Sequence, residues 1–293
     1  MEDPEAYRRY AMPGIERARE ADSEVLAFAA AGPLTRSYNL LLDAAARRDD
    51  VEALVLLQED IEIDDPDFCA KVRSALDASD VALVGSAGAK GVTGIAWWEG
   101  EVSAAPAVQR YNEHGSGELP AFSWLQPSPP PMEVAALDGA LLVLPPWTLA
   151  NVRFDESLRL RYGFDLDYCS QVRAAGRKVV TADLRTIRHR PLELVPKPHH
   201  QAWVDAHMGV AAKWEGSLPG PGRAGGDWKQ RARYAEAERE AARTIAYSSS
   251  SALDAQIGPL ERELAEITQS VSWRLTKPLR DLRLWLAGRR SRP

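Results

Sequence analysis

The sequence has few cysteines and no long apolar run. Its 293 residues include two cysteines, Cys69 and Cys169, which lie far apart in stretches that we expect to be helical. They imply no disulfide framework, so a reducing compartment is the better expectation. No run approaches the eighteen or so apolar residues that a membrane span requires. The first residues, MEDPE, do not resemble a leader peptide. We therefore expect a cytoplasmic protein.

Acidic residues outnumber basic ones, except at one end of the chain. The net charge is −6, and residues 274–293 contain seven Arg or Lys against one acid, which leaves −12 for residues 1–273. An acidic body argues against nucleic acid as the main ligand. No Gly-rich phosphate loop follows any expected strand, which weakens the hypothesis of an unrelated α/β nucleotide-binding protein.

Short apolar runs alternate with helical patterns along the first two thirds of the chain. Such runs are typical of strands that are buried on both faces. We expect strands at residues 25–30, 53–57, 81–85, 140–144 and 178–183, and helices at residues 4–21, at 35–48 and from 65 onwards. Strands that alternate with helices predict an α/β fold with a doubly wound, mostly parallel sheet.

One expected strand runs into a cluster of carboxylates. In LVLLQEDIEI, residues 54–63, the apolar residues are followed by Gln58, Glu59 and Asp60. Ligands of doubly wound sheets bind just beyond the carboxyl ends of the strands, which is where these side chains would lie. Neighbouring acids repel one another unless a cation compensates them, and water, a basic side chain or a divalent metal would serve. A solvated loop or a helix cap explains the same residues about equally well.

Aromatic residues gather before and within a segment rich in Gly and Pro. Trp97 and Trp98 precede residues 100–131, a loop of the length that is usually functional or disordered. Sugar rings stack on exposed aromatic side chains, so an acceptor cleft is one interpretation of this region. Tryptophans that pack under a loop are the other.

The last part of the chain has a different composition. We expect a Gly/Pro linker at residues 215–229 and a helical tail at residues 230–293. A short heptad seam at 253–271 would form a homodimer or pack back on the same chain. The basic stretch 274–293 could lie on an anionic membrane at the inner face of the plasma membrane, or be a solvated helix end that docks on the acidic body.

Four stretches, taken in order, resemble a known family. They are SYNLLLDAA at 37–45, LVLLQEDIEI at 54–63, LDGALLVL at 137–144 and YGFDLDYCSQVRAAGRKVV at 162–180, and IRHRPLEL follows at 187–194. The pattern resembles family 2 glycosyltransferases of the A-type fold, in particular the StrF-like branch, over residues 1–214. The resemblance implies a nucleotide-sugar donor, a glycan, lipid-linked or secondary-metabolite acceptor, and Mn²⁺ or Mg²⁺ as cofactor.

The resemblance also implies roles for individual residues. Asp60 would bind the metal, although the usual histidine of the triplet is replaced by Gln58, and Glu59 would add a donor-side carboxylate. Asp165 would be the general base that takes the proton of the acceptor hydroxyl. The alternative explanation of Asp165 is structural: its side chain would cap the following helix. Asp167 would then face solvent or support the acceptor side.

The remaining candidates follow from the same resemblance. His189 would be a second metal ligand, or a structural histidine whose neighbours Arg188 and Arg190 hold phosphate. Asp138 would lie on the acceptor side. Asn39 would hold a loop near the nucleotide, or be an ordinary amide within a helix.

The first strand of the family is missing from this sequence, and residues 1–20 have a helical pattern instead. We expect either a start site further upstream or a reduced donor site, and favour the former. Two functions from different classes remain. One is an inverting, metal-dependent glycosyltransferase, and the other is a catalytically impaired binding module that acts through its C-terminal helix.

Overall fold

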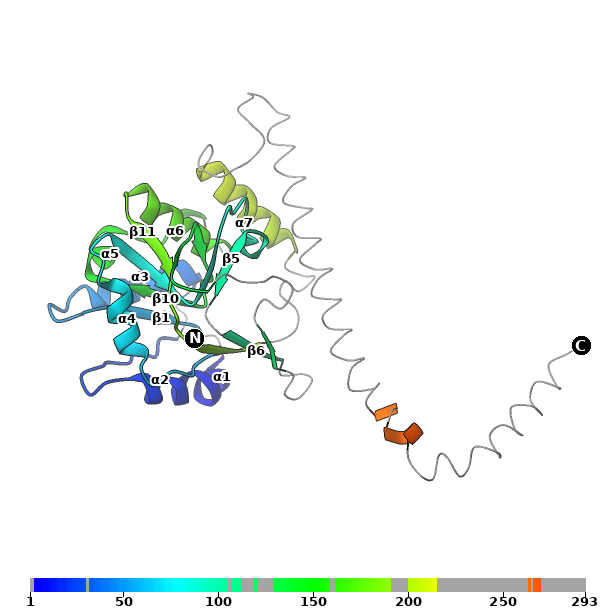
Figure 1. Cartoon of the computed structure of the whole chain (residues 1–293). Helices are drawn as coiled ribbons and strands as arrows, with labels where there is room; N and C mark the ends of the chain where they lie inside the picture. The colour runs from blue at the N-terminus through cyan, green and yellow to red at the C-terminus, as the bar shows by residue number, and fades with distance from the viewer. Residues whose placement is uncertain are drawn as a thin grey trace, which may run out of the picture. The chain divides into compact units, whose positions relative to one another are not determined.

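Figure 1 shows the computed structural model of the chain. The structure describes residues 3–29, 32–104, 107–111, 118–120, 129–158, 162–190, 200–214, 263–264 and 266–269. The predicted linker, the basic end and nearly all of the heptad seam lie outside the described residues, as does most of the loop between 105 and 128. The domain boundaries, the membrane contact and the homodimer therefore stay predictions.

The described helices and strands alternate along the chain. The helical segments are α1 (Pro4–Ala6), the π-helix η1 (Tyr7–Ala11), α2 (Met12–Ala18), α3 (Leu34–Ala45), α4 (Phe68–Leu76), η2 (Trp97–Glu99), α5 (Pro146–Asn151), η4 (Glu156–Leu158), α6 (Phe164–Ala174) and α7 (His200–Lys213). The strands are β1 (Leu54–Leu57), β2 (Ile61–Ile63), β3 (Val81–Gly85), β4 (Ala87–Lys90), β5 (Glu101–Ala104), β6 (Ala107–Tyr111), β7 (Glu118–Pro120), β8 (Met132–Glu133), β9 (Ala136–Leu137), β10 (Leu141–Leu144), β11 (Lys178–Thr181) and β12 (Thr186–Arg190).

The central sheet has the strand order β1-β10-β3-β11-β8. β10 pairs antiparallel with β1 and β3, β11 pairs parallel with β3, and β8 pairs antiparallel with β11. Three of its strands, β1, β3 and β11, therefore run in one direction, and β10 and β8 run in the other. The predicted α/β class with a mostly parallel sheet is confirmed, with the qualification that β3 and β11 are its one adjacent parallel pair among the described strands.

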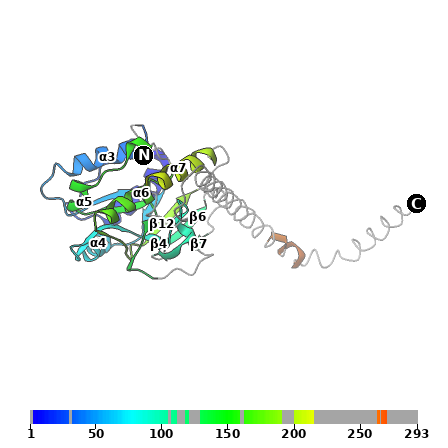
Figure 2. The same ribbon diagram turned by 90° about the horizontal axis from the view of Figure 1, so that it is seen from above.

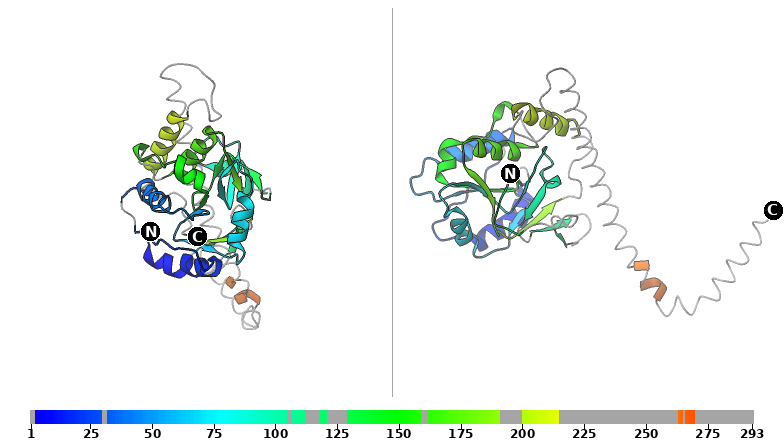
Figure 3. Two further views of the ribbon diagram at one scale, coloured as in Figure 1. Left: turned by 90° about the vertical axis from the view of Figure 1, so that its left-hand side faces the viewer. Right: turned by 45° about the horizontal axis from the view of Figure 1, so that its top comes forward.

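Helices cover both faces of this sheet. Because side chains alternate along a strand, β10 contributes to two separate cores. Leu142 and Leu144 pack with α3, α5 and α6, whereas Leu141 and Val143 pack with α2 and α4. In Figure 2, seen from above, α3, α5 and α6 lie across the strands. In both views of Figure 3 the N-terminal helices, in dark blue, lie on the opposite side of the strands from the green helices.

The start of the first helix agrees with the prediction. Oδ1 of Asp3 accepts hydrogen bonds from the backbone N–H groups of Glu5 at 2.9 Å and Ala6 at 3.0 Å, as expected of a residue that caps a helix. The helical segment ends at Ala18, close to the predicted end.

The predicted strand at residues 25–30 is wrong. Residues 25–29 form no helix or strand, and Val25 and Leu26 are 37% and 45% exposed. An apolar run becomes a strand only if a neighbouring strand pairs with its backbone, and no described ladder includes these residues. The segment borders a cavity beside β1 instead.

A second sheet brings distant segments to the end of β1. Its strand order is β2-β12-β6-β7, and β12 pairs antiparallel with β2, with Arg188 opposite Ile61. Since β2 follows β1 after three residues, this pairing places β12 next to the carboxylates that end β1. No described helix is long and apolar enough to cross a membrane.

Candidate functional site

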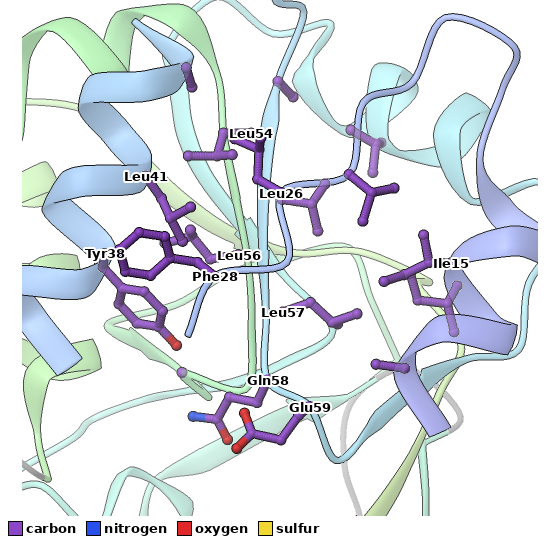
Figure 4. Close-up of a pocket in the computed structure, with 18 of the residues that line it drawn as sticks. Ile15, Leu26, Phe28, Tyr38, Leu41, Leu54, Leu56, Leu57, Gln58 and Glu59 are labelled. Carbon is purple, nitrogen blue, oxygen red and sulfur yellow. The ribbon is translucent and has the colours of Figure 1, made fainter. Parts of the chain in front are cut away.

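A cavity of about 1440 Å³ opens beside β1, between α3 on one side and α2 and α4 on the other. Within the described chain, no strand pairs with the outer edge of β1, so this edge faces the cavity. Figure 4 shows Leu26 and Phe28 beside Leu54 and Leu56, with Gln58 and Glu59 below them at the end of β1. The cavity therefore joins an apolar region to a charged end.

The charged end begins where β1 stops. The backbone N–H of Gln58 donates to the carbonyl of Ala140 at 3.0 Å, which continues the pairing with β10 by one residue. Glu59 and Asp60 then form a turn into β2. Oε1 of Glu59 accepts from the backbone N–H of Asp3 at 3.1 Å, and Glu59 lines the cavity.

Arg188 is the cation that compensates these acids. Its Nε donates to Oδ2 of Asp60 at 3.3 Å, its Nη1 to Oδ2 of Asp138 at 3.2 Å, and its Nη2 to Oε1 of Gln58 at 3.2 Å. Burial works against the charge of Arg188, but the carboxylates of Asp138 and Asp60 outweigh it and raise the pKa of the guanidinium. Of the three compensating groups considered from sequence, the structure has a basic side chain.

Asp165 lies close to this ion-pair group. It is the second residue of α6, and Gly163 with φ +73° stands at the cap position. Oδ2 of Asp165 accepts from the backbone N–H of Gly139 at 3.1 Å, and Oδ1 accepts from the backbone N–H of Leu166 at 2.9 Å. A Cβ at Gly139 would lie 3.0 Å from Cβ of Asp165 and 2.6 Å from the ring of Phe164, so only glycine permits this approach.

The carboxyl group of Asp165 has an unusual proton affinity. Burial, followed by repulsion from Asp138, raises its pKa from 3.8 to about 7, although the backbone N–H groups of Leu166, Gly139 and Asp165 itself oppose the rise. A carboxyl group with a pKa near 7 is suited to take up a proton and release it again at neutral pH. Asp165, Asp138 and Gly139 all line the cavity, so this group is accessible to a ligand.

An aromatic cluster lies on the same cavity. Trp97 is buried and Trp98 half-buried, and the two rings meet edge to face with centroids 5.9 Å apart. The Trp98 ring lies 5.8 Å from that of Trp203 on α7, which in turn lies 5.2 Å from Tyr162. All four residues line the cavity. The packing that was one interpretation from sequence is observed, and contact of these rings with an acceptor stays a prediction.

Two other candidate residues lie elsewhere. Asn39 binds the segment after α5: its Nδ2 donates to the carbonyl of Phe154 at 2.9 Å, and its Oδ1 accepts from the backbone N–H of Phe154 at 3.0 Å. Asp167 is 1% exposed and contacts Nζ of Lys213 at 2.8 Å and Nε1 of Trp214 at 2.8 Å. Residues two apart on a helix face different ways. Accordingly, Asp165 lines the cavity, whereas Asp167 joins α6 to the end of α7.

The structure does not bring His189 and the Asp60 carboxylate together. Neighbouring residues of a strand point to opposite faces. Arg188 reaches the Asp60 carboxylate, whereas the His189 ring stacks on Tyr10 at 3.9 Å and its Nε2 contacts Oε2 of Glu62 at 3.0 Å. The backbone N–H of His189 does donate to the carbonyl of Asp60 at 2.8 Å.

The arrangement does not fit the divalent metal that the family resemblance implies. Among the described residues, no three His, Cys, Asp or Glu side chains form a group that could hold a metal ion. Oδ2 of Asp60 is paired with Arg188, and Oδ1 is buried and accepts no hydrogen bond. A hydrated cation at Oδ1 would need access through protein atoms, and it would be repelled by the adjacent guanidinium.

Sequence reasoning missed the cavity residues on distant elements. Tyr38 precedes Asn39 in the SYN stretch and lines the cavity with a buried ring. Trp203 on α7 lies outside the quoted motifs, and Tyr162 is the first residue of the motif at 162–180, to which no role was assigned. Arg188 was considered from sequence, but only as a neighbour of His189 and an alternative to it.

No protein-family model matches the chain. Two solved structures are similar: a mannosyltransferase, PcManGT from Pyrobaculum calidifontis, in complex with GDP-Man and Mn²⁺ (17% identity, 80% of this chain and 60% of that chain, TM-score 0.36), and GalNAc-T7 with UDP, GalNAc and Mn²⁺ (13% identity, 75% of this chain and 44% of that chain, TM-score 0.38). Likenesses this distant carry no argument about the site.

The sequence match is closer. The chain is 30% identical over 188 residues to the streptomycin biosynthesis protein StrF of Streptomyces griseus, which takes in 62% of each protein. The chain thus spans less than two thirds of the length of StrF. The resemblance drawn from the motifs is thus supported by a sequence match, and the chain is similar to StrF over these 188 residues.

Proposed function

We propose that the chain is a glycosyltransferase that moves a sugar from a nucleotide-sugar donor to an acceptor hydroxyl, with inversion at the anomeric carbon. The observation that carries the proposal is the carboxyl group of Asp165, which lines a large cavity and has a pKa of about 7. The motif resemblance and the similarity to StrF support the reaction class. The acceptor would be a cell-envelope polysaccharide, a lipid-linked glycan or a secondary metabolite.

The reaction would be a single displacement. The acceptor oxygen forms a bond to the anomeric carbon while the bond from that carbon to the diphosphate oxygen breaks. The electron pair of the broken bond stays on the nucleoside diphosphate, and the proton of the acceptor hydroxyl passes to the Asp165 carboxylate. Attack on the side opposite the leaving group inverts the configuration.

The surrounding residues would orient the base and the acceptor. The backbone N–H groups of Gly139 and Leu166 hold both oxygens of Asp165. The N-terminus of α6 also favours the carboxylate after it has lost its proton. The half-buried ring of Trp98 offers an apolar surface on the same cavity for an acceptor sugar ring.

The proposal is tested by donor binding and donor breakdown in one set of variants. Thermal shift with UDP, GDP and dTDP identifies the nucleotide, since a ligand of the folded state raises the melting temperature. The matching nucleotide sugars are then incubated with the protein, and release of the nucleoside diphosphate is measured with water or added sugars as acceptor. Asp165→Asn should keep nucleotide binding and lose release.

Asp155→Asn is the matched control, because Asp155 lies outside the cavity lining and pairs with Lys213 at 2.7 Å. It should keep both binding and release. Release by Asp165→Asn at the rate of the wild type would refute the assignment of the base. A protein that binds none of the nucleotides under any condition would refute the transferase.

A second candidate function is favoured by one observation. The metal ligand set implied by the resemblance is not formed, because Asp60 is paired with Arg188 and His189 with Glu62. A catalytically impaired module that binds a partner would have this feature. It predicts nucleotide binding without release for the wild type and for Asp165→Asn alike.

A further inference from the structure

The guanidinium of Arg188 is held in a fixed position by three residues from two segments. Its three nitrogens contact Asp60 after β1, Asp138 before β10 and Gln58 at the end of β1. Arg188 itself belongs to β12, which pairs with β2 and β6. A planar guanidinium with an acceptor at each nitrogen has little freedom to rotate. The guanidinium of Arg188 is therefore held in one orientation.

The side chain of Arg188 borders the cavity. Arg188 lines the cavity together with Gln58, Glu59 and Asp138, whereas Asp60 is not among the lining residues. The side chains of Arg188 and Asp138 are 23% and 25% exposed. Asp60, which the resemblance implies as a metal ligand, thus lies beside the guanidinium and outside the cavity lining. The guanidinium itself can contact a ligand that enters the cavity.

Arg188 has a donor to spare for such a ligand. A guanidinium carries five N–H groups. Nε contacts Asp60, Nη1 contacts both carboxylate oxygens of Asp138 at 3.2 and 3.4 Å, and Nη2 contacts Gln58 alone, so one N–H of Nη2 has no acceptor among the described residues. A terminal N–H of this kind can donate a charge-assisted hydrogen bond to a phosphate oxygen.

The other cations of the cavity lining are also paired with carboxylates, but on other segments. Arg19 pairs with Glu16, Arg48 with Glu24 and Asp50, and Arg73 with Glu20 and Glu52. They line the cavity from the segments around α2, α3 and α4, and each of these arginines is 39–45% exposed. Among the described lining residues, Arg188 is the cation that adjoins Asp165 and Asp138.

We propose that Arg188 takes the place of a divalent cation in this chain: its guanidinium binds the diphosphate of the nucleotide-sugar donor, and donor binding requires no metal. The inference rests on the proposed function. As the bond to the anomeric carbon breaks, the departing electron pair raises the negative charge on the diphosphate, and the fixed guanidinium charge stabilises it. Asp60 acts as a positioning residue that holds Arg188 from behind.

The test measures binding of UDP, GDP and dTDP to the full chain by calorimetry, in EDTA and in Mn²⁺. For the nucleotide that binds, the wild-type dissociation constant should be the same in both solutions within about twofold. The corresponding nucleoside without phosphates should bind at least about tenfold more weakly, since it lacks the contact that a charged hydrogen bond supplies.

Two variants and a matched control separate charge from structure. Arg188→Gln should weaken nucleotide binding by about tenfold or more, and Arg188→Lys should weaken it less, because lysine keeps the charge but lacks the planar fork. Arg185→Gln is the control. Arg185 lies in the same segment, is exposed and does not line the cavity, so its variant should bind like the wild type.

The outcomes distinguish the inference from the function on which it rests. Nucleotide binding that disappears in EDTA and returns with Mn²⁺ would overturn the role of Arg188 and leave the transferase intact. The same conclusion would follow if Arg188→Lys or Arg188→Gln bound as tightly as the wild type. If neither variant folds, the comparison of EDTA with Mn²⁺ in the wild type decides alone. Binding of no nucleotide in either solution would overturn both proposals.

Discussion

The raised pKa of Asp165 predicts that the protein loses stability as the pH rises from 5 to 8. An acid whose pKa is higher in the folded state than in the unfolded chain binds more protons when folded, between the two pKa values. The folded state is therefore favoured at low pH, and that advantage declines as the pH rises from 3.8 toward about 7. Replacing Asp165 by Asn removes this dependence.

The magnitude follows from the two pKa values. A rise from 3.8 to about 7 corresponds to about 4 kcal/mol at pH 8, at about 1.4 kcal/mol per pH unit. About 3 kcal/mol of this is lost between pH 5 and pH 8, since about two of the three units lie in that interval. Asp165 also faces the cavity, and solvent there screens its charge, so these figures are upper limits.

The assay is urea unfolding of the wild type and Asp165→Asn at pH 5 and pH 8. The useful quantity is the change in the free energy of unfolding between the two pH values, because an Asn side chain cannot accept both backbone hydrogen bonds and this constant loss cancels in the difference. The wild type should lose up to about 3 kcal/mol more than the variant. Asp165→Asn should thus be inactive and yet comparatively stable at pH 8.

Asp155→Asn is again the matched control. The ammonium of Lys213 and the hydroxyl of Ser157 lower the pKa of Asp155 to about 2. Its stabilising effect is therefore present at pH 5 and at pH 8 and declines only below the ordinary pKa. The control should be less stable at both pH values and show the pH dependence of the wild type. An equal pH dependence in Asp165→Asn and the wild type would show that Asp165 does not titrate near neutral pH.

Two further predictions follow from neighbouring contacts. Asp138→Asn should move the rising limb of the pH profile of donor breakdown to lower pH, because repulsion from Asp138 raises the pKa of Asp165; an unchanged limb would remove Asp138 from this role. Lys213→Met should lower the free energy of unfolding by about 3 kcal/mol, since it leaves the buried Asp167 without its ammonium partner. Donor breakdown with added sugars as acceptor should not change in Lys213→Met, and a loss of breakdown with unchanged nucleotide binding would return Asp167 to the acceptor side.

The local parts of the fold could be predicted from sequence. The strands β1, β3, β10 and β11 each coincide with a predicted apolar run, although three of the four residues of β1, which lies beside the cavity, are only half-buried. The start of the first helix follows from Asp3 and Pro4. The error at residues 25–30 has a physical cause. Apolar composition reports burial, whereas a strand also needs a pairing partner, and pairing depends on segments far away in the sequence.

Only those parts of the site that consecutive residues form could be predicted from sequence, because the other parts depend on contacts between distant segments. The end of β1 and the start of α6 were recognisable because the residues that form them are consecutive. The ion-pair group could not be derived, because Arg188 and Asp60 are 128 residues apart and meet only through the pairing of β12 with β2. Asp167 shows the converse case. Its spacing from Asp165 alone would have placed it on a different helix face, where Lys213 and Trp214 bind it.

The two accounts of donor binding differ by a single residue on β12. Side chains alternate along a strand, so a shift of one position would turn His189 toward the Asp60 carboxylate and Arg188 away from it. The observed register is held on the face away from the cavity, where the ring of His189 stacks on Tyr10 at 3.9 Å and bonds to Glu62 at 3.0 Å. On the cavity face it is held by the contacts of Arg188. The contacts on both faces of β12 are consistent with the same register, which favours an arginine site over a histidine–metal site. The comparison of nucleotide binding in EDTA and in Mn²⁺ therefore also tests this register.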